Sequence, residues 1–290
     1  KEVRRIYGLV NMVTVSIKVD GNTENLYMDG GLYKHLTKKV KPSVEKKDFD
    51  YVMIVDGSEG TGKSVMAFQI AKVLDPKFDL DNICFTPSEF IKAVTHAKPY
   101  SCIVFDEAFT GLSSRAALSE VNRLLVSLMM EMRQNNLFVI LVMPTFFMLD
   151  KYAVLHRSKE MFHVHLRNGK RGFWRFYDKD KMKKMYFDGK KYYEYKVRPR
   201  SFGRYKGLWA INEKKYLEKK RKSLKGKQRR TKAEAYKEQR DTLLYILIKD
   251  MKLGQRGTSR VCSKYGFSIN HSTLSDVFTQ KQKELLETQD

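Results

Sequence analysis

Eight consecutive residues have the types and the spacing that are needed to hold a chain of phosphates. The stretch Gly57-Ser58-Glu59-Gly60-Thr61-Gly62-Lys63-Ser64 fits the pattern G-x-x-x-x-G-K-S/T. Its glycines allow the backbone to turn tightly and to direct its N–H groups at phosphate oxygens. An apolar run leads into the loop and a helix-spaced segment follows it, so the positive end of a helix dipole would also face the phosphates.

Each residue of this loop has an expected role. Lys63 would reach the β- and γ-phosphates, and the Ser64 hydroxyl would be a ligand of Mg²⁺. We therefore expect ATP and Mg²⁺ as cofactors, and a chance glycine-rich turn is the alternative. The residues expected to contact the nucleotide are Gly57, Ser58, Glu59, Gly60, Thr61, Gly62, Lys63, Ser64 and Val65.

Two adjacent carboxylates follow another apolar run. The segment Ser101-Cys102-Ile103-Val104-Phe105 predicts a buried strand, and Asp106 and Glu107 come directly after it. Asp106, at the C-terminal end of the sheet, would hold Mg²⁺ directly or through water. Glu107 would orient or deprotonate the water that attacks the γ-phosphate. An exposed acidic pair at a strand end is the alternative, but the phosphate loop upstream favours the catalytic interpretation.

These groups need a scaffold that brings them together. Near-continuous apolar runs, typical of parallel strands buried on both faces, cover Tyr51–Val55, Ile83–Phe85, Cys102–Phe105 and Leu137–Met143. Helix-spaced apolar residues cover Ser64–Leu74, Pro87–His96 and Leu118–Arg133. This alternation predicts an α/β core over residues 51–166, built on a doubly wound, mainly parallel sheet.

The segments next to this core differ from it in character. Residues 1–50 contain short alternating apolar pieces between turn residues, which predicts a small β-rich lead-in. Alternation around Asn168-Gly169 predicts a β-hairpin, and Asp188-Gly189 a second turn, in an extension over residues 167–211. Residues 212–232 hold eleven Lys and Arg against two Glu, and we expect a basic linker there.

Residues 233–290 predict a small α-helical C-terminal domain. Ala233–Met251 has the spacing of a helix, with an apolar side formed by Leu243, Leu244, Ile246 and Leu247. Thr258–Phe278 looks like a DNA-binding helix-turn-helix. Its second helix would open with Ser272, Thr273, Ser275 and Asp276, facing base edges. A helical bundle used for oligomer contacts is the alternative.

Composition narrows the partners and the compartment. The 290 residues carry a net charge of +23, which attracts polyanions and makes DNA the first partner to consider; a generically basic surface is the alternative. Three scattered cysteines do not make a disulfide framework and suit a reducing compartment. No apolar run approaches the roughly 18 residues of a membrane span, and no signal-peptide core follows Lys1-Glu2-Val3-Arg4-Arg5. We expect no membrane insertion and a cytoplasmic location, in the host cell if the chain is viral.

The phosphate loop, the Asp106-Glu107 pair and the strand between them resemble the P-loop ATPases that have an additional central strand and a catalytic glutamate. The order of elements over residues 50–166 resembles the FtsK/HerA group, the zonula-occludens-toxin-like assembly ATPases and the viral DNA-packaging motors. This resemblance implies a RecA-like sheet, ATP hydrolysis, and a homo-oligomeric ring acting on double-stranded DNA.

The resemblance also implies two further catalytic groups. Family members present a polar sensor of the γ-phosphate after the fourth strand, where Thr145 is the only hydroxyl. In ring motors an arginine from the neighbouring subunit completes each site. Arg133 is the first choice for that arginine, and Arg115 and Arg157 are alternatives.

Two histidines raise the question of a metal site. His163 and His165 share one face of a predicted strand, as metal ligands do. No Cys, Asp or Glu close to them in the sequence completes a ligand set. We therefore expect a solvated strand face here and no metal site.

Taken together, these features predict an ATP-hydrolysing DNA translocase or genome-packaging motor of a virus or mobile element. An alternative is an ATP-dependent helicase loader, or a switch in transposition or replication, that binds DNA without pumping it. A DNA-bound regulatory or partition protein, in which the C-terminal domain dominates, is a second alternative.

Overall fold

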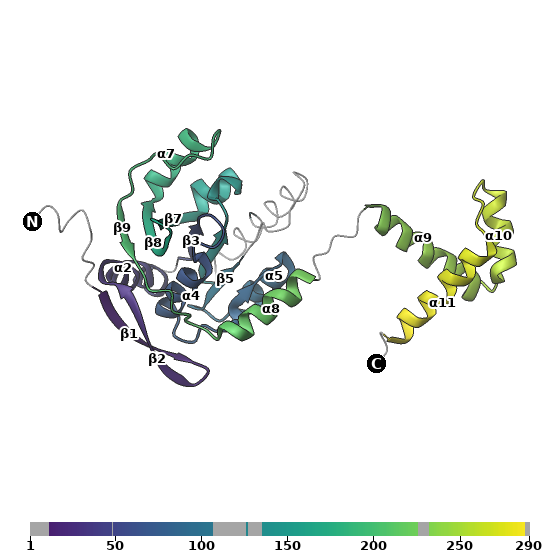
Figure 1. Cartoon of the computed structure of the whole chain (residues 1–290), viewed down its shortest axis with the longest axis horizontal. Coiled ribbons are helices and arrows are strands. Elements are labelled where there is room, and N and C mark those ends of the chain that lie inside the picture. The colour runs from purple at the N-terminus through teal and green to yellow at the C-terminus, as the bar shows by residue number, and fades with distance from the viewer. Residues whose placement is uncertain (1–11, 48, 107–125, 127–134, 226–231, 288–290) are drawn as a thin grey trace, which may run out of the picture. The chain divides into compact units, whose positions relative to one another are not determined.

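The four apolar runs predicted as strands lie in one sheet, together with three further strands. The strands are β3 (Tyr51–Asp56), β4 (Ile83–Cys84), β5 (Cys102–Phe105), β6 (Phe138–Met143), β7 (Ser158–Arg167), β8 (Lys170–Asp178) and β9 (Ser201–Arg204). Their order is β4-β5-β6-β3-β7-β8-β9, with parallel pairing from β4 to β7 and antiparallel pairing from β7 to β9. The chain is therefore α/β, with a mostly parallel seven-stranded sheet (Figure 1).

The computed structural model describes residues 12–47, 49–106, 126, 135–225 and 232–287. The chain divides into two compact units, Lys1–Lys227 and Gln228–Asp290, and the sheet belongs to the first. The helix expected over Leu118–Arg133 falls outside the described residues except at residue 126. Within the described ranges, no helix combines the length and the apolar character that crossing a bilayer requires.

Helices cover both faces of the sheet because its central strands are apolar on both sides. Neighbouring residues of β3 belong to different cores, with Met53 on one face and Ile54 on the other. Helix α4 (Lys63–Leu74) packs in the first core, and α5 (Pro87–His96) and α7 (Lys179–Gly189) pack in the second. The helices expected before and after β4 are thus confirmed.

The N-terminal lead-in is only half β-structure, and the expectation for residues 30–45 is wrong. Strands β1 (Met12–Val19) and β2 (Asn22–Asp29) form an antiparallel hairpin, the β-structure of this segment. The chain then continues as α2 (Gly30–His35), a π-helical turn over Leu36–Val40, and α3 (Lys41–Glu45). Asp29-Gly30-Gly31, which has the composition of a turn, starts a helix because the Asp29 carboxylate accepts a hydrogen bond from the Leu32 N–H, 2.8 Å away.

The spacing of apolar residues in this segment explains why it is helical. Leu32, Leu36, Val40 and Val44 recur every four residues and are buried in the core beside α4. That spacing places them along one side of a helix, whereas a strand would turn every second residue inward.

The β7–β8 hairpin confirms the Asn168-Gly169 turn, since both residues have the positive φ that a type I′ turn requires, 49° and 70°. The hairpin is part of the main sheet, because β7 pairs with β3, so the boundary expected at residue 166 falls inside it. The second expected turn, Asp188-Gly189, is wrong: these residues end helix α7.

The segment expected to be a basic linker is largely a helix of the first unit. Helix α8 (Glu213–Lys225) lies beside α5, where the Ser223 hydroxyl donates to the Glu89 carboxylate over 2.8 Å (Figure 1). The Lys219 ammonium donates to the carbonyl oxygens of Leu80 and Ile83, at 2.6 and 2.8 Å. The linker prediction is wrong because it rested on the number of Lys and Arg residues. Only a few side chains of α8 hold it to the first unit, and they are not conspicuous among the lysines.

The second unit contains α9 (Lys232–Lys249), α10 (Gly254–Lys264) and α11 (His271–Glu287). Its helices agree with those expected, and Gly266 takes a positive φ of 84° at the turn between α10 and α11. A small core forms from Leu244, Ile248, Leu274 and Val277. The apolar side of α9 was predicted wrongly, because Leu243 is 61% exposed and Leu244 only 4%.

This difference gives a test of the second unit's core. Leu244→Ala should destabilise it by about 2–5 kcal/mol, the usual result of emptying a buried leucine site. Leu243→Ala, the matched control, should change stability by less than about 0.5 kcal/mol. Both tryptophans, Trp174 and Trp209, lie in the first unit. Urea unfolding followed by far-ultraviolet circular dichroism should therefore shift for Leu244→Ala while tryptophan fluorescence does not; equal shifts for the two variants would contradict the burial of Leu244.

Candidate functional site

The phosphate loop occupies the carboxyl end of β3 and leads into α4, as expected. Gly57 has a φ of 141°, and a Cβ at this position would lie 2.0 Å from the Val164 carbonyl oxygen of β7. Gly62 has a φ of 97°, and a Cβ there would lie 2.5 Å from the Tyr205 hydroxyl. These two glycines are therefore required by conformation and by close packing.

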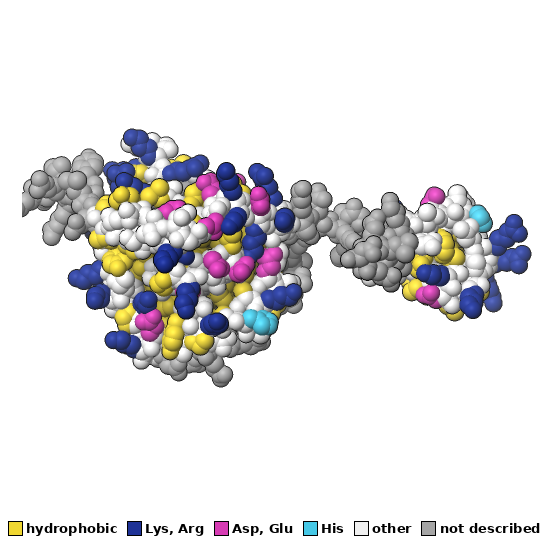
Figure 2. Space-filling model, turned by 90° about the horizontal axis from the view of Figure 1, so that it is seen from below, with side chains coloured by type: hydrophobic (Ala, Val, Ile, Leu, Met, Phe, Trp, Pro, Cys, Tyr) yellow, Lys and Arg dark blue, Asp and Glu magenta, His cyan; other side chains and the backbone are white. Residues whose placement is uncertain are grey.

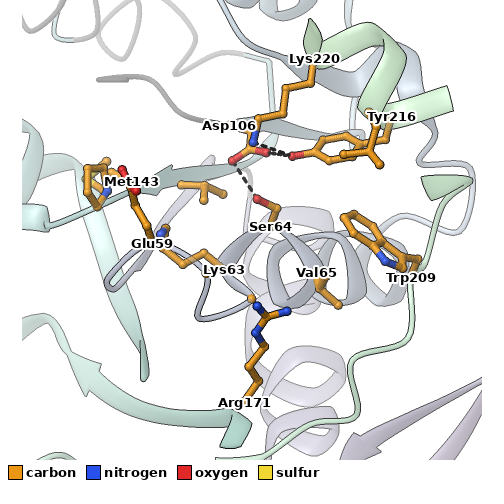
Figure 3. Close-up of a pocket in the computed structure, with 15 residues that line it drawn as sticks. Glu59, Lys63, Ser64, Val65, Asp106, Met143, Arg171, Trp209, Tyr216 and Lys220 are labelled. Atoms are coloured by element: carbon orange, nitrogen blue, oxygen red, sulfur yellow. Dashed lines mark hydrogen bonds between the residues drawn. The ribbon is translucent and has the colours of Figure 1, made fainter. Parts of the chain in front are cut away.

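The loop and the predicted magnesium carboxylate meet in one cleft of about 410 Å³ (Figure 3). The Ser64 hydroxyl, in the first turn of α4, donates to Asp106 Oδ1 over 3.1 Å. Lys63 also lines the cleft, and its ammonium donates to the Ser58 carbonyl oxygen over 2.9 Å. The structure thus brings together the three side chains of the motif that were expected to act on phosphate and metal.

A tyrosine that the sequence did not single out completes this group. The Tyr216 hydroxyl of α8 donates to Asp106 Oδ2 over 2.6 Å, and the Tyr216 side chain is only 2% exposed (Figure 3). Asp106 itself is fully buried, so each carboxylate oxygen needs a donor. Lys220, one turn further along α8, lines the same cleft. No local pattern could reveal this contact, which joins residues 110 positions apart.

The segment that precedes α8 is hydrogen-bonded to the phosphate loop. The Tyr205 hydroxyl donates to the carbonyl oxygens of Thr61 and Gly62, at 3.3 and 2.9 Å. Burial raises the pKa of Tyr205, so its hydroxyl stays protonated and remains a donor. The Gln69 amide donates to the carbonyl oxygens of Lys206 and Leu208, which fixes the segment that carries Trp209 to the cleft wall.

Among the described residues, the arginine that lines the cleft is Arg171, which the sequence did not suggest. Arg171, at the start of β8, lines the cleft, and one guanidinium nitrogen would be 3.8 Å from a Cβ on Gly60. Arg157, an alternative for an arginine acting on the neighbouring subunit, pairs instead with the buried carboxylate of Asp50 in its own chain. Arg157 is therefore held in an ion pair within its own chain, and its proposed action on a neighbouring subunit stays a prediction.

A second buried carboxylate ends β3, immediately before the loop. Asp56 Oδ2 accepts from the Tyr195 hydroxyl at 2.5 Å and from the Phe146 N–H at 3.1 Å, and Oδ1 lies 3.0 Å from His163 Nδ1. The face of β7 that carries His163 is therefore partly buried at this point, contrary to the solvated face expected. Burial and the Asp56 charge raise the pKa of Tyr195, which keeps it a donor.

Several expected roles are not tested by this geometry. The Thr145 hydroxyl lies 2.9 Å from the Tyr195 hydroxyl, and its neighbours Met143 and Pro144 line the cleft. Glu107, Arg115 and Arg133 lie outside the described residues. In the described ranges no three His, Cys, Asp or Glu side chains gather as metal ligands. A magnesium ion in the cleft would therefore rely on Ser64, Asp106, phosphate oxygens and water, which is how Mg²⁺ is commonly held.

Comparison with models of known protein families gave no match to this chain, and comparison with curated proteins gave no significant match.

The Tyr216–Asp106 contact predicts a measurable loss of stability. Tyr216→Phe keeps the ring and removes the donor, which leaves a buried carboxylate oxygen without that hydrogen bond. Loss of a hydrogen bond to a charged group should cost about 1.5–3 kcal/mol. Trp209 contacts Tyr216, with ring centroids 5.2 Å apart, so tryptophan fluorescence during urea unfolding can report the change. Tyr236→Phe, at a tyrosine 67% exposed, is the control; equal unfolding midpoints for both variants would contradict the assignment.

Proposed function

We propose that this chain binds ATP with Mg²⁺ and hydrolyses its terminal phosphoanhydride bond. The observation that carries the proposal is the hydrogen bond between the Ser64 hydroxyl and Asp106, 42 residues apart, in the cleft that Lys63 lines. A chance glycine-rich turn gives no reason for a hydroxyl, a carboxylate and an ammonium group to converge beside it. A magnesium–phosphate site requires all three.

Each group in the cleft has a part in this chemistry. Loop N–H groups and Lys63 would bind the β- and γ-phosphates, and Arg171 would add a second cation beside them. Ser64 and Asp106 would supply two oxygen ligands to Mg²⁺, which neutralises charge on the phosphates when bound. Tyr216 would hold Asp106 so that Oδ1 faces Ser64. Glu107 would orient or deprotonate the attacking water.

The order of the strands supports the division of P-loop ATPases proposed from the sequence. Strand β6 lies between β3, which leads into the loop, and β5, which ends at Asp106. An added central strand would occupy that place, whereas β4, the strand that lies between the two motifs in the sequence, is at the edge of the sheet beside β5. The sheet is compatible with a RecA-like fold. We extend the proposal to an ATP-driven DNA motor of a virus or mobile element, assembled as a homo-oligomeric ring in the cytoplasm. Thr145 as sensor and Arg133 acting on the neighbouring subunit remain part of this proposal.

Charge and the second unit support DNA as the partner. The chain carries a net charge of +23, and Figure 2 shows Lys and Arg spread over the visible face of each unit. Near the start of α11 Ser272 and Asp276 are exposed and Thr273 is partly exposed, where a recognition helix would meet base edges. We propose that α10 and α11 act as a helix-turn-helix.

The catalytic part of the proposal makes a direct prediction. Glu107→Gln should retain ATP binding and lower turnover by about 100-fold or more, because the attacking water loses its base. Lys63→Ala should weaken ATP binding itself. Glu45→Gln, at an exposed glutamate paired with Lys41 in α3, is the control for loss of a carboxylate. Steady-state hydrolysis and equilibrium nucleotide binding separate the two effects, and undiminished turnover in Glu107→Gln would remove Glu107 from the mechanism.

A motor and a switch differ in what ATP hydrolysis does to DNA. A translocase should show DNA-stimulated hydrolysis and should displace the third strand of a DNA triplex in the presence of ATP. Glu107→Gln should bind the same DNA and displace nothing, because movement requires turnover. Stimulated hydrolysis without displacement would favour the loader or switch over the motor.

A further inference from the structure

Three antiparallel strands at one edge of the sheet share a face that the nucleotide cleft does not use. On β8, Phe173 pairs with His165 of β7 on one side and with Arg204 of β9 on the other. Two residues further along, Arg175 pairs with His163 and with Phe202. Directly paired residues point to the same side of a sheet, so aromatic and basic side chains alternate across this face. We call Arg167, His165, Phe173, Arg175, Phe202 and Arg204 the hairpin face.

One aromatic ring of the hairpin face, Phe202, is exposed, and the other, the partly buried Phe173, is in contact with arginines. Phe202 is 56% exposed, so its ring is open to solvent. The guanidinium carbons of Arg204 and Arg167 lie 5.0 and 6.0 Å from the centre of the Phe173 ring. Such cation–π contacts hold the ring and the cations together on the surface. The face is hollowed by a pocket of about 340 Å³.

The electrostatic character of the hollow is positive. Arg167 and Arg175 line it and supply the charge, the neighbouring His165 is neutral at neutral pH, and none of the described residues lining it is acidic. The pKa of His165 is lowered, first by burial and then by the charges of Arg175, His163 and Arg167. Positive charge around an accessible aromatic ring is complementary to a phosphate backbone with unpaired bases.

We propose that the hairpin face binds single-stranded DNA, with a base stacked on Phe202 and phosphates held by Arg175 and Arg204. Proteins that hold single strands combine a positive groove with aromatic side chains on which bases stack. A duplex offers phosphates but keeps its base faces stacked on each other, so it cannot use Phe202. The face is therefore more complementary to a single strand than to the duplex that the family resemblance implies.

Binding of single-stranded DNA by the hairpin face does not require ATP hydrolysis; only its role within a DNA motor rests on the proposed function. The hairpin face is joined to the nucleotide site through β7, which pairs with β3 immediately before the phosphate loop. Arg171, at the start of β8, lines the nucleotide cleft, so the hairpin presents one surface to DNA and one side chain to phosphate. A motor built this way would hold a strand next to the loop that responds to ATP.

The test is binding of a dye-labelled oligothymidylate to the full chain without nucleotide, measured by fluorescence anisotropy over a range of salt concentrations. Phe202→Ala should weaken binding roughly 5- to 100-fold at each salt concentration, as expected for loss of one stacked base. Arg204→Gln should flatten the slope of log affinity against log salt by about 0.7, the effect of one phosphate contact on a single strand. A duplex of the same length should show little response to Phe202→Ala.

Matched controls identify indirect effects. Phe187→Ala, at a phenylalanine 53% exposed on α7, and Lys92→Gln, on α5, should bind like the wild type. Thermal unfolding should be unchanged in Phe202→Ala, because its side chain is mostly solvated. Oligothymidylate affinity unaltered in both Phe202→Ala and Arg204→Gln would overturn the proposal, and so would a duplex that loses as much affinity as the single strand. Because no ATP is present, a chain that binds DNA here but hydrolyses nothing would refute only the proposed function.

Discussion

Two carboxylates that are fully buried at the ends of central strands organise this protein. Asp56 ends β3 and Asp106 follows β5, and neither is accessible to water. Burying an ionised carboxylate is costly unless hydrogen-bond donors replace its water. The chain provides them from distant segments: Tyr195, His163 and the Phe146 N–H for Asp56, and Ser64 and Tyr216 for Asp106. The requirement to satisfy these two groups thus determines which parts of the sequence lie around the phosphate loop.

One consequence is that the candidate nucleotide site is assembled from segments far apart in the sequence of the first unit. The phosphate loop and Asp106 come from the expected core, while Arg171, Trp209 and Tyr216 come from the segments after it. The ammonium and guanidinium groups of Lys63, Lys220 and Arg171 line one cleft, where their mutual repulsion is relieved most effectively by a polyanion. Helix α8 forms one wall of that cleft and is followed in the chain by the second unit, so the proposed ATP and DNA functions meet in adjacent stretches of sequence.

The β7–β8 hairpin and the phosphate loop also pack directly against each other. Gly57 approaches the Val164 backbone of β7 so closely that no side chain fits between them, and His163 on the same strand contacts Asp56. The loop and β7 are therefore in direct contact, and close-packed groups have little free volume in which to absorb a displacement. The proposed DNA-binding face lies on the solvent side of this same hairpin.

The sequence by itself determined the local features. The runs around Ile54, Val104 and Ile140 predicted buried strands, the glycines of the loop predicted its turns, and Asn168-Gly169 predicted a hairpin, because each depends on neighbours a few residues away. Only the tertiary structure decided that Tyr216 hydrogen-bonds Asp106, that Arg157 is an internal ion pair and that lysine-rich α8 is part of the first unit. The physical reason is that a long-range hydrogen bond or ion pair needs only one donor and one acceptor. Such a pair leaves no periodic trace in the sequence, whereas burial of a helix or strand face does.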